Sequence, residues 1–337
     1  MDSVTQFALG ATVGTLALGA RIGPRRAALF GGILAMLPDL DILLPAADPV
    51  EAFVNHRGFS HSIIVHTLIA PVAGEALRLA ARPLRDARLR CYLAVWLILV
   101  THALLDAFTT YGTRIFWPLS ERPVSLSTIF IIDPAYTLPL LAAMIMALAG
   151  GRWRPTIAYG ARLALLLSSL YLAWTVVAQQ IAERKVLAAL ERHGIKAERL
   201  VMIPMPFNSF LWRGLAVEGD RYYNVYRSVL DTGDSGGVHA HERRMALADG
   251  LPDQSRIAAI ADFSGGFYAF RRVGDELLLS DLRLGVEPNY VFTFRIAEFR
   301  QGMAAAVFPV RMPRGYDLTQ LGWLWRRIFD ETAPRKE

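Results

Sequence analysis

Acidic and imidazole side chains gather in three short segments of an otherwise apolar amino-terminal half. In the first segment, Asp39 and Asp41 follow Pro38 and are separated by one residue. Carboxylates and neutral imidazoles, without cysteine, suit Zn²⁺, Mn²⁺ or Fe²⁺. The three segments predict a site for one or two such divalent ions, with the candidate ligands Asp39, Asp41, His56, His61, His102 and Asp106.

The second segment also carries side chains that could act on a substrate or support a ligand. His56 and His61 stand five positions apart, and a loop that folds back can bring both imidazoles to one ion. Arg57 can hold an anionic oxygen of a phosphate or carboxylate bidentately. Ser60 could cap the helix that follows, and Ser62 could hydrogen-bond a metal ligand. A capped helix with incidental histidines is the structural alternative.

The third segment places His102 and Asp106 four residues apart, on one face of a helix and about one turn apart. They could ligate an ion jointly, or the carboxylate could orient the imidazole. A purely structural His–Asp pair is the alternative. His66 lies one turn deeper than His61, and we expect it to be a buried, hydrogen-bonded histidine more readily than a ligand.

The elements that must position these residues are membrane helices. Of the 337 residues, 53% are hydrophobic and 20% are charged, and the mean hydropathy is +0.32. Soluble domains carry about 25% charged residues. Runs of about 20 apolar residues can span a bilayer. They are expected at about residues 4–20, 26–45, 60–81, 91–111, 129–149 and 159–181.

These runs predict an α-helical polytopic membrane domain of about six helices over residues 1–183. A β-rich α+β soluble domain is expected over residues 184–337. Its strands are expected at 199–203, 209–217, 221–229, 265–272, 276–282 and 290–296.

Two turns and a terminal helix complete this expected domain. Glu218-Gly219-Asp220 and Val273-Gly274-Asp275 are typical of hairpin turns, and 231–237 is expected to be a loop. A helix over about 318–329, capped by Asp317, would align Leu318, Leu321, Trp325 and Phe329. We expect it to pack on its own sheet, with the membrane surface as the alternative.

Arginine placement predicts the orientation of the helices. Arginines cluster in the loops 21–26, 82–90 and 150–155, which indicates that these loops are cytoplasmic. The second span then ends, the third begins and the fourth ends at the opposite face. All six candidate ligands therefore fall at one depth on the extracytoplasmic side, together with the carboxy-terminal domain. Asp133 enters the fifth span from the same side and is a weaker candidate.

The net charge of +6 comes mostly from these arginine clusters. No basic stripe alternates with aromatic residues, so nucleic-acid binding is not expected. The expected partner is the lipid bilayer itself. One cysteine, Cys91, lies inside an apolar run and excludes an intrachain disulfide.

Several of these segments together resemble a known family. The segments Met1–Gln6, Pro38–Asp41, His56–Ser62 and His102…Asp106 resemble the YdjM-like family of bacterial and archaeal inner-membrane proteins, which are predicted metal-dependent hydrolases. Phe116-Trp117-Pro118-Leu119 and Ile132-Asp133-Pro134 resemble a subgroup with an extra carboxy-terminal domain. The resemblance covers about residues 1–150 and implies a bacterial inner membrane and a metal site on the six ligands. Many members carry histidine at Gln6, where this chain could offer a weak ligand or a hydrogen bond.

The leading function is a membrane-embedded metal-dependent hydrolase, with zinc as the preferred ion. Arg57 and a dication both suit a phosphoryl group, so a phosphoester or lipid-linked substrate is expected. Asp39 could serve as ligand or general base, Arg57 could stabilise negative charge, and Ser62 could support a ligand. The alternatives are a metal or proton transporter and a membrane-anchored binding or regulatory protein with a structural metal. The scarcity of polar residues in the fifth and sixth spans argues against transport.

Overall fold

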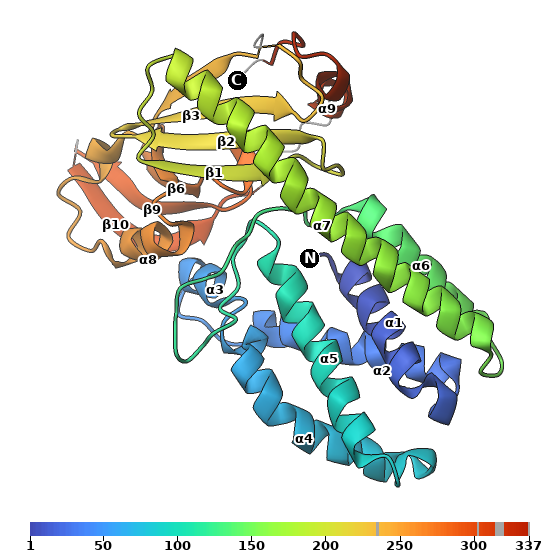
Figure 1. Cartoon of the computed structure of the whole chain (residues 1–337). Coiled ribbons are helices and arrows are strands. Elements are labelled where there is room, and N and C mark those ends of the chain that lie inside the picture. Colours follow the sequence, from blue (N-terminus) through green and yellow to red (C-terminus); the bar gives the residue numbers. More distant parts are fainter. Residues whose placement is uncertain (234–235, 302, 314–319, 336–337) are drawn as a thin grey trace. The chain divides into compact units, whose positions relative to one another are not determined.

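A computed structural model describes residues 1–233, 236–301, 303–313 and 320–335 of the chain (Figure 1). The chain divides into two compact units. The first unit contains residues 1–44, 57–176 and 206–208, and the second contains residues 45–56, 177–205 and 209–337. The first is helical and the second is rich in antiparallel sheet, which confirms the expected fold class.

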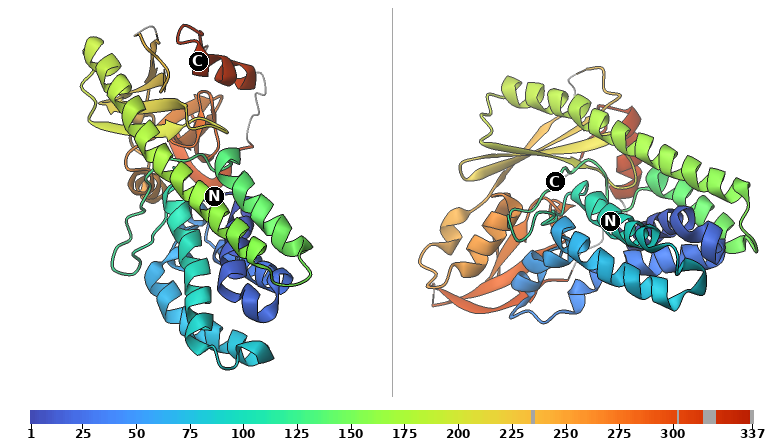
Figure 2. Two further views of the ribbon diagram at one scale, coloured as in Figure 1. Left: turned by 45° about the vertical axis from the view of Figure 1, so that its right-hand side comes forward. Right: turned by 60° about the horizontal axis from the view of Figure 1, so that its bottom comes forward.

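Four helices of the described chain are long and apolar enough to cross a membrane. They are α1 (Ser3–Ile22), α4 (Ile63–Ala80), α5 (Arg88–Ala107) and α7 (Pro155–Arg192). A shorter apolar helix, α6 (Pro134–Ala149), begins where Asp133 caps it, so the expected fifth span loses its first residues. The helix α7 is continuous through residue 183 and ends at Arg192. Both views in Figure 2 show it as one long, uninterrupted helix.

The expected second span is wrong as a single helix. Helix α2 covers only Pro24–Ala35, and the short 3₁₀ helix η1 (Pro38–Leu43) follows it. Twelve residues of α-helix extend about 18 Å, less than the roughly 30 Å hydrocarbon core. Pro38 lacks an amide hydrogen and opens the new turn. The break carries Asp39 and Asp41 out of the α-helix and into η1.

Small residues allow α1 and α2 to pack against each other closely. Gly23, with φ of 85°, makes the turn between them, and Pro24 begins α2. A Cβ atom added to Gly31 would lie 2.1 Å from the carbonyl oxygen of Gly10. The glycine pair therefore brings the two backbones into direct contact, as small residues do between membrane helices.

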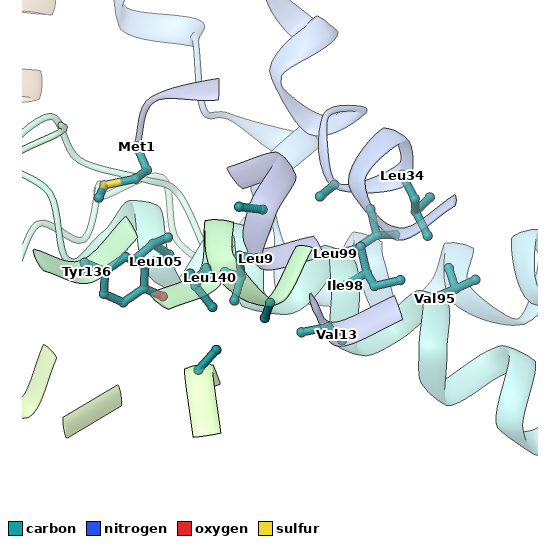
Figure 3. Close-up of a cluster of buried hydrophobic side chains, with 14 of the residues drawn as sticks. Met1, Leu9, Val13, Leu34, Val95, Ile98, Leu99, Leu105, Tyr136 and Leu140 are labelled. Atoms are coloured by element: carbon teal, nitrogen blue, oxygen red, sulfur yellow. The ribbon is translucent and has the colours of Figure 1, made fainter. Parts of the chain in front are cut away.

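An apolar cluster holds α1, α2, α5, α6 and the first part of α7 together. Figure 3 shows its side chains, among them Leu9 and Val13 of α1, Ile98 of α5 and Leu140 of α6. Ser168 of α7 adds a hydrogen bond of 2.8 Å to the carbonyl oxygen of Tyr136. By holding these helices together, the cluster fixes the positions of the helix ends near which the polar residues lie.

The second unit contains two four-stranded antiparallel sheets. The first has the order β1-β2-β3-β4, and its strands are β1 (Arg199–Pro204), β2 (Leu211–Glu218), β3 (Arg221–Ser228) and β4 (Val238–Glu242). The second has the order β10-β9-β6-β5, with β5 (Tyr268–Val273), β6 (Glu276–Asp281), β9 (Thr293–Arg300) and β10 (Met303–Arg311). The strands β7 (Gly285–Val286) and β8 (Asn289–Tyr290) form a small ribbon.

Alternation along β2 explains how its sheet is covered. Trp212 and Ala216 pack on the carboxy-terminal part of α7, whereas Leu215 and Val217 face the other way. The latter contact Tyr290 in a cluster with residues of the second sheet. The period of two that places alternate side chains on opposite faces is the ordinary property of a strand.

Both expected hairpin turns are confirmed. Gly219 joins β2 to β3 with φ of 55°, and Gly274 joins β5 to β6 with φ of 58°. The strand β10 and the helix α8 (Ser255–Ser264) were not expected from the sequence.

The terminal helix packs as expected but with a different face. Helix α9 (Gln320–Phe329) buries Leu324 and Ile328, while Trp325 and Phe329 are exposed. The predicted face was therefore wrong. The expected cap Asp317, together with Leu318, lies outside the described residues, and the side chain of Leu321 is not described.

Residues 45–56 join the second unit although they precede the third span in the sequence. Their helix α3 (Pro49–Asn55) is capped by Asp48, which also accepts a hydrogen bond of 3.0 Å from Arg256. The ring of Phe53 lies 4.9 Å from that of Phe263 and 4.2 Å from that of Phe292. This helix was not expected, although Asp48 followed by Pro49 is a typical helix start.

Candidate metal centre

Four side chains of the first unit converge at one end of the helices. Asp39 comes from η1, and His61 ends the 3₁₀ turn η2 (Phe59–His61), which runs directly into α4. His102 and Asp106 come from the last two turns of α5. One ligand atom from each of the four lies within 4.8 Å of the other three. This is the only cluster of this kind among the residues that the structure describes.

The spacing of these four atoms fits a metal ion. His61 Nε2 lies 3.1 Å from His102 Nε2, 3.3 Å from Asp39 Oδ1 and 3.2 Å from Asp106 Oδ2. His102 Nε2 lies 3.6 Å from Asp39 Oδ1 and 3.4 Å from Asp106 Oδ2. Ligands about 2.0–2.1 Å from a tetrahedral zinc ion lie about 3.3–3.4 Å from one another. Five of the six separations among the donor atoms are therefore close to the edges of such a polyhedron.

The hydrogen bonding of Asp106 gives an independent test of this fit. Its side chain is fully buried. Its Oδ1 atom accepts a hydrogen bond of 3.0 Å from Gln6 and contacts the amino group of Met1. Its Oδ2 atom, which faces the two imidazoles, has no hydrogen-bond partner among the described residues. A buried carboxylate oxygen without a hydrogen bond is costly. The Arg57 guanidinium, whose Nε lies 3.1 Å away, offsets part of its charge, and a cation held by His61 and His102 would complete its surroundings.

Asp39 is the most accessible ligand of the four. Its side chain is 19% exposed, whereas those of His61, His102 and Asp106 are fully buried. Burial disfavours its charge, but hydrogen bonds from His102 and His61 outweigh this effect and hold the pKa of the Asp39 carboxyl below its ordinary value. The carboxylate is therefore available as a ligand, and access from outside comes on its side of the cluster.

Asp41 fixes the turn that presents His61. Its Oδ2 atom accepts a hydrogen bond of 2.9 Å from the backbone amide of Arg57 and one of 2.6 Å from Ser60 Oγ. Ser60 Oγ also lies 2.9 Å from His61 Nδ1. The structure thus places Asp41 behind the imidazole, 3.6 Å from Nδ1. In this position it orients a ligand, and it is not in the group of four.

The sequence-based roles of the two serines are reversed. Ser62 caps α4, since its hydroxyl accepts from the amides of Ile64 and Val65 and donates to the carbonyl oxygen of Trp117. Ser60, which was the expected cap, contacts the imidazole of His61 instead. The reason is the 3₁₀ turn over residues 59–61, which delays the start of the helix to Ile63.

Arg57 lies against the cluster in a strained backbone conformation. Its φ of 62° is in the left-handed region, which costs a residue with a side chain of order 1 kcal/mol. Its Nε lies 3.1 Å from Asp106 Oδ2, and one of its terminal nitrogens donates to Thr109 Oγ1 at 2.9 Å. Its guanidinium also covers the ring of Tyr111. The surrounding contacts therefore hold a buried cation beside the ligands.

The remaining expected residues lie outside the group of four. His66 is buried and hydrogen-bonded through Nε2 to the carbonyl oxygen of Ser60, as expected. His56 ends α3 and belongs to the second unit. Asp133 caps α6 and accepts a hydrogen bond from Tyr171 at 2.8 Å, so its role here is a helix cap.

Comparison with known proteins identifies the membrane unit. Residues 1–182, which contain the whole group of four, match the family described as YdjM inner membrane protein. The match covers more than half of the 337 residues. The chain belongs to the YdjM family. Together with its apolar helices, membership of the YdjM family makes it an inner membrane protein.

Two curated relatives agree with the YdjM assignment. The chain is 36% identical over 122 residues to the inner membrane protein YbcI of Escherichia coli (strain K12), which is 35% of this chain and 68% of YbcI. It is 32% identical over 157 residues to the uncharacterized protein YfhP of Bacillus subtilis (strain 168), which is 45% of this chain. That match covers 47% of YfhP, so the chain spans about half of that relative's length. No solved structure matches.

One supporting residue of this YdjM-family site, Thr109, was not predicted, and a second, Ser60, was assigned another role. Thr109 follows α5 and holds Arg57, and only its nearness to Asp106 in the sequence could have suggested it. Ser60 was noticed, but as a cap. Gln6 was noticed as a possible ligand or hydrogen-bonding group. It hydrogen-bonds a ligand, Asp106, and donates a second bond of 3.2 Å to the carbonyl oxygen of His102.

Proposed function

We propose that this YdjM-family protein is a membrane-embedded, metal-dependent hydrolase that acts on a phosphoester or lipid-linked substrate. The observation that carries the proposal is the convergence of His61, His102, Asp39 and Asp106 on one point, next to a buried guanidinium. Mixed imidazole and carboxylate ligation is typical of sites that keep an ion reactive, whereas closed structural zinc sites are rich in cysteine.

A bound divalent ion would supply Lewis acidity, which activates water and polarises the bond to be cleaved. The protein side chains do the rest. Asp39 and Asp106 would balance the charge of such an ion, and the Arg57 guanidinium beside Asp106 would be the positive group nearest to an anionic substrate. The strained backbone of Arg57 and its bond to Thr109 hold that guanidinium in place before substrate arrives. Such preorganised charge is the effective kind in catalysis.

The surroundings of Asp39 support a substrate with an apolar part. The accessible edge of the cluster is bordered along η1 and its flanks by exposed apolar side chains. Ile42 is 68% exposed and Leu43 is 75% exposed, and Leu37, Leu40 and Leu44 are about half exposed. In an inner membrane protein such a border can contact lipid chains. We therefore favour an amphiphile whose polar head reaches the ion while its chains stay in the bilayer.

The arginine-rich loops favour an extracytoplasmic site. They join α1 to α2, α4 to α5 and α6 to α7, at the opposite ends of these helices from the metal ligands. With positive loops inside, the ligands face outward. A transport role fits less well, because the apolar side chains of Leu9, Val13 and Ile98 fill the space between the helices next to the cluster.

The test is hydrolysis by the purified, metal-loaded full-length protein in mixed micelles. The probes are phosphatidic acid and soluble p-nitrophenyl phosphate. Wild type is expected to cleave the lipid faster than the soluble ester, and Arg57→Gln is expected to lose roughly 10²–10³-fold in rate, as loss of a charge-stabilising donor does. His193→Ala, which changes a histidine bonded to the Ala189 carbonyl oxygen in the second unit, is the control. Equal rates for wild type and Arg57→Gln, or bound metal without hydrolysis of a broader ester panel, would contradict the proposal.

A further inference from the structure

A second feature lies at the other ends of the helices, in the three arginine-rich loops. The turn between α1 and α2, with the adjoining helix ends, carries Arg21, Arg25 and Arg26, and the loop after α6 contains Arg152 and Arg154. The loop between α4 and α5, with the first turn of α5, carries Arg82, Arg85, Arg88 and Arg90. Only Glu75 and Asp86 accompany them as acidic residues. The function proposed for the metal cluster does not use this charge.

Specific contacts join the three loops into one surface, which we call the arginine face. Arg21 binds both carboxylate oxygens of Asp86, at 2.7 and 2.9 Å, and so links the first loop to the second. Arg25 donates to the carbonyl oxygens of Leu148 and Ala149, at 2.7 and 3.1 Å, and so links the first loop to the end of α6. These contacts therefore hold the positive charges of the three segments on one surface.

An aromatic side chain also fixes the third loop to the arginine face. Trp153 packs directly on Gly19 of α1, where an added Cβ atom would lie 2.4 Å from the indole ring. Tryptophan is enriched where membrane helices meet the headgroup layer. A tryptophan at this end of the helices is typical of the headgroup level.

Most of the guanidinium groups on this face have no partner within the described chain. Glu75 is already bound by Arg78, Arg88 and Tyr92. Asp86 is taken by Arg21. Six exposed side chains are left without a hydrogen bond or ion pair to any described residue, namely Arg26, Arg82, Arg85, Arg90, Arg152 and Arg154.

From this we infer that the arginine face binds the headgroups of anionic phospholipids. A guanidinium pairs with phosphate through two parallel hydrogen bonds, which suits a layer of phosphodiesters. Clusters of basic residues next to membrane helices attract anionic lipids, with an effect that adds up over the residues involved. Arg21 and Arg25 build the surface, and the six unpaired arginines supply the contacts to the lipid. The inference does not depend on hydrolysis at the other end of the helices.

The experiment measures thermal unfolding of the full-length protein in a neutral detergent. Short-chain phosphatidylglycerol and phosphatidylcholine with identical acyl chains are added separately, so that only the headgroup differs. Phosphatidylglycerol is expected to raise the unfolding temperature of wild type at lower concentration than phosphatidylcholine, and high salt is expected to weaken this effect. The triple variant Arg26→Gln/Arg85→Gln/Arg152→Gln, with one change in each loop, should need roughly 10- to 100-fold more phosphatidylglycerol.

A matched triple variant controls for net charge. Arg122→Gln/Arg221→Gln/Arg326→Gln removes three exposed arginines outside the arginine face and should keep the wild-type response. Equal stabilisation of wild type by both lipids would overturn the inference and leave the arginines with an orienting role only. An equal loss in the two triple variants would overturn it as well. If the first triple variant does not fold, the wild-type comparison of the two lipids with and without salt still decides the question.

Discussion

The imidazoles of His61 and His102, 41 positions apart in sequence, face each other with their Nε2 atoms 3.1 Å apart. One lies in a 3₁₀ turn before α4 and the other near the end of α5. Two fully buried carboxylate-flanked imidazoles that point at each other form a natural ligand pair.

Substitutions of the two serines before α4 should have different effects. Ser60→Ala removes the hydroxyl between Asp41 and His61, so metal affinity should fall about 10-fold with little change in stability. Ser62→Ala removes the helix cap and should cost about 0.5–2 kcal/mol of stability while metal affinity changes little. Metal titration and thermal unfolding of both variants check this, and the same loss of affinity in both would contradict it.

The two neighbouring aspartates should also differ. Asp39→Asn removes a ligand and should abolish measurable metal binding, whereas Asp41→Asn keeps an acceptor behind His61 and should weaken binding by about 10–100-fold. Competition with a chelator of known affinity gives both values. If Asp41→Asn lost binding completely while Asp39→Asn kept it, the assignment of the two carboxylates would be reversed.

The close contact of α1 and α2 predicts a sharp steric effect. Gly31→Ala would place a methyl group 2.1 Å from the Gly10 carbonyl oxygen, and such overpacking should destabilise the protein by about 1–3 kcal/mol or more. Gly151→Ala is the matched control, because nothing lies within 4 Å of its added Cβ atom. Thermal unfolding in detergent compares them, and equal midpoints would argue against the close packing.

The placement of residues 45–56 in the second unit can be tested through Phe53. Phe53→Ala should destabilise the protein by about 3–5 kcal/mol, since the ring is buried against Phe263, Phe292 and Phe294. Phe308→Ala, at a ring that is 65% exposed, should stay within about 0.5 kcal/mol of wild type. Similar stability of the two variants would show that α3 does not pack on this unit.

The sequence predicted the four converging residues better than the residues that support them. His102 and Asp106 followed from helical spacing alone, because α5 is regular through both residues. Asp39 and Asp41 could not be told apart, since nothing in the sequence shows that a 3₁₀ turn directs one carboxylate to the imidazoles and the other behind them. For the same reason the start of α4 was placed too early and the serines were exchanged.

The main errors in the predicted fold have two causes. Apolar runs show where helices can lie, but not where a helix stops within a run. The expected second span continued past Ala35 although Pro38 begins a new turn there. The face of α9 was misplaced because Trp325 and Leu324 are both apolar, and the choice between them depends on the tertiary contacts of β2 and β3.

The most direct test of the metal centre is the metal content of the full-length protein, purified in detergent and dialysed against each ion. Inductively coupled plasma mass spectrometry should find at least one equivalent of zinc, manganese or iron in wild type. It should find less than about one tenth of that in His61→Ala and Asp39→Asn, while His193→Ala stays at the wild-type value. Equal metal content in wild type and the two ligand variants, with all of them folded, would contradict the account.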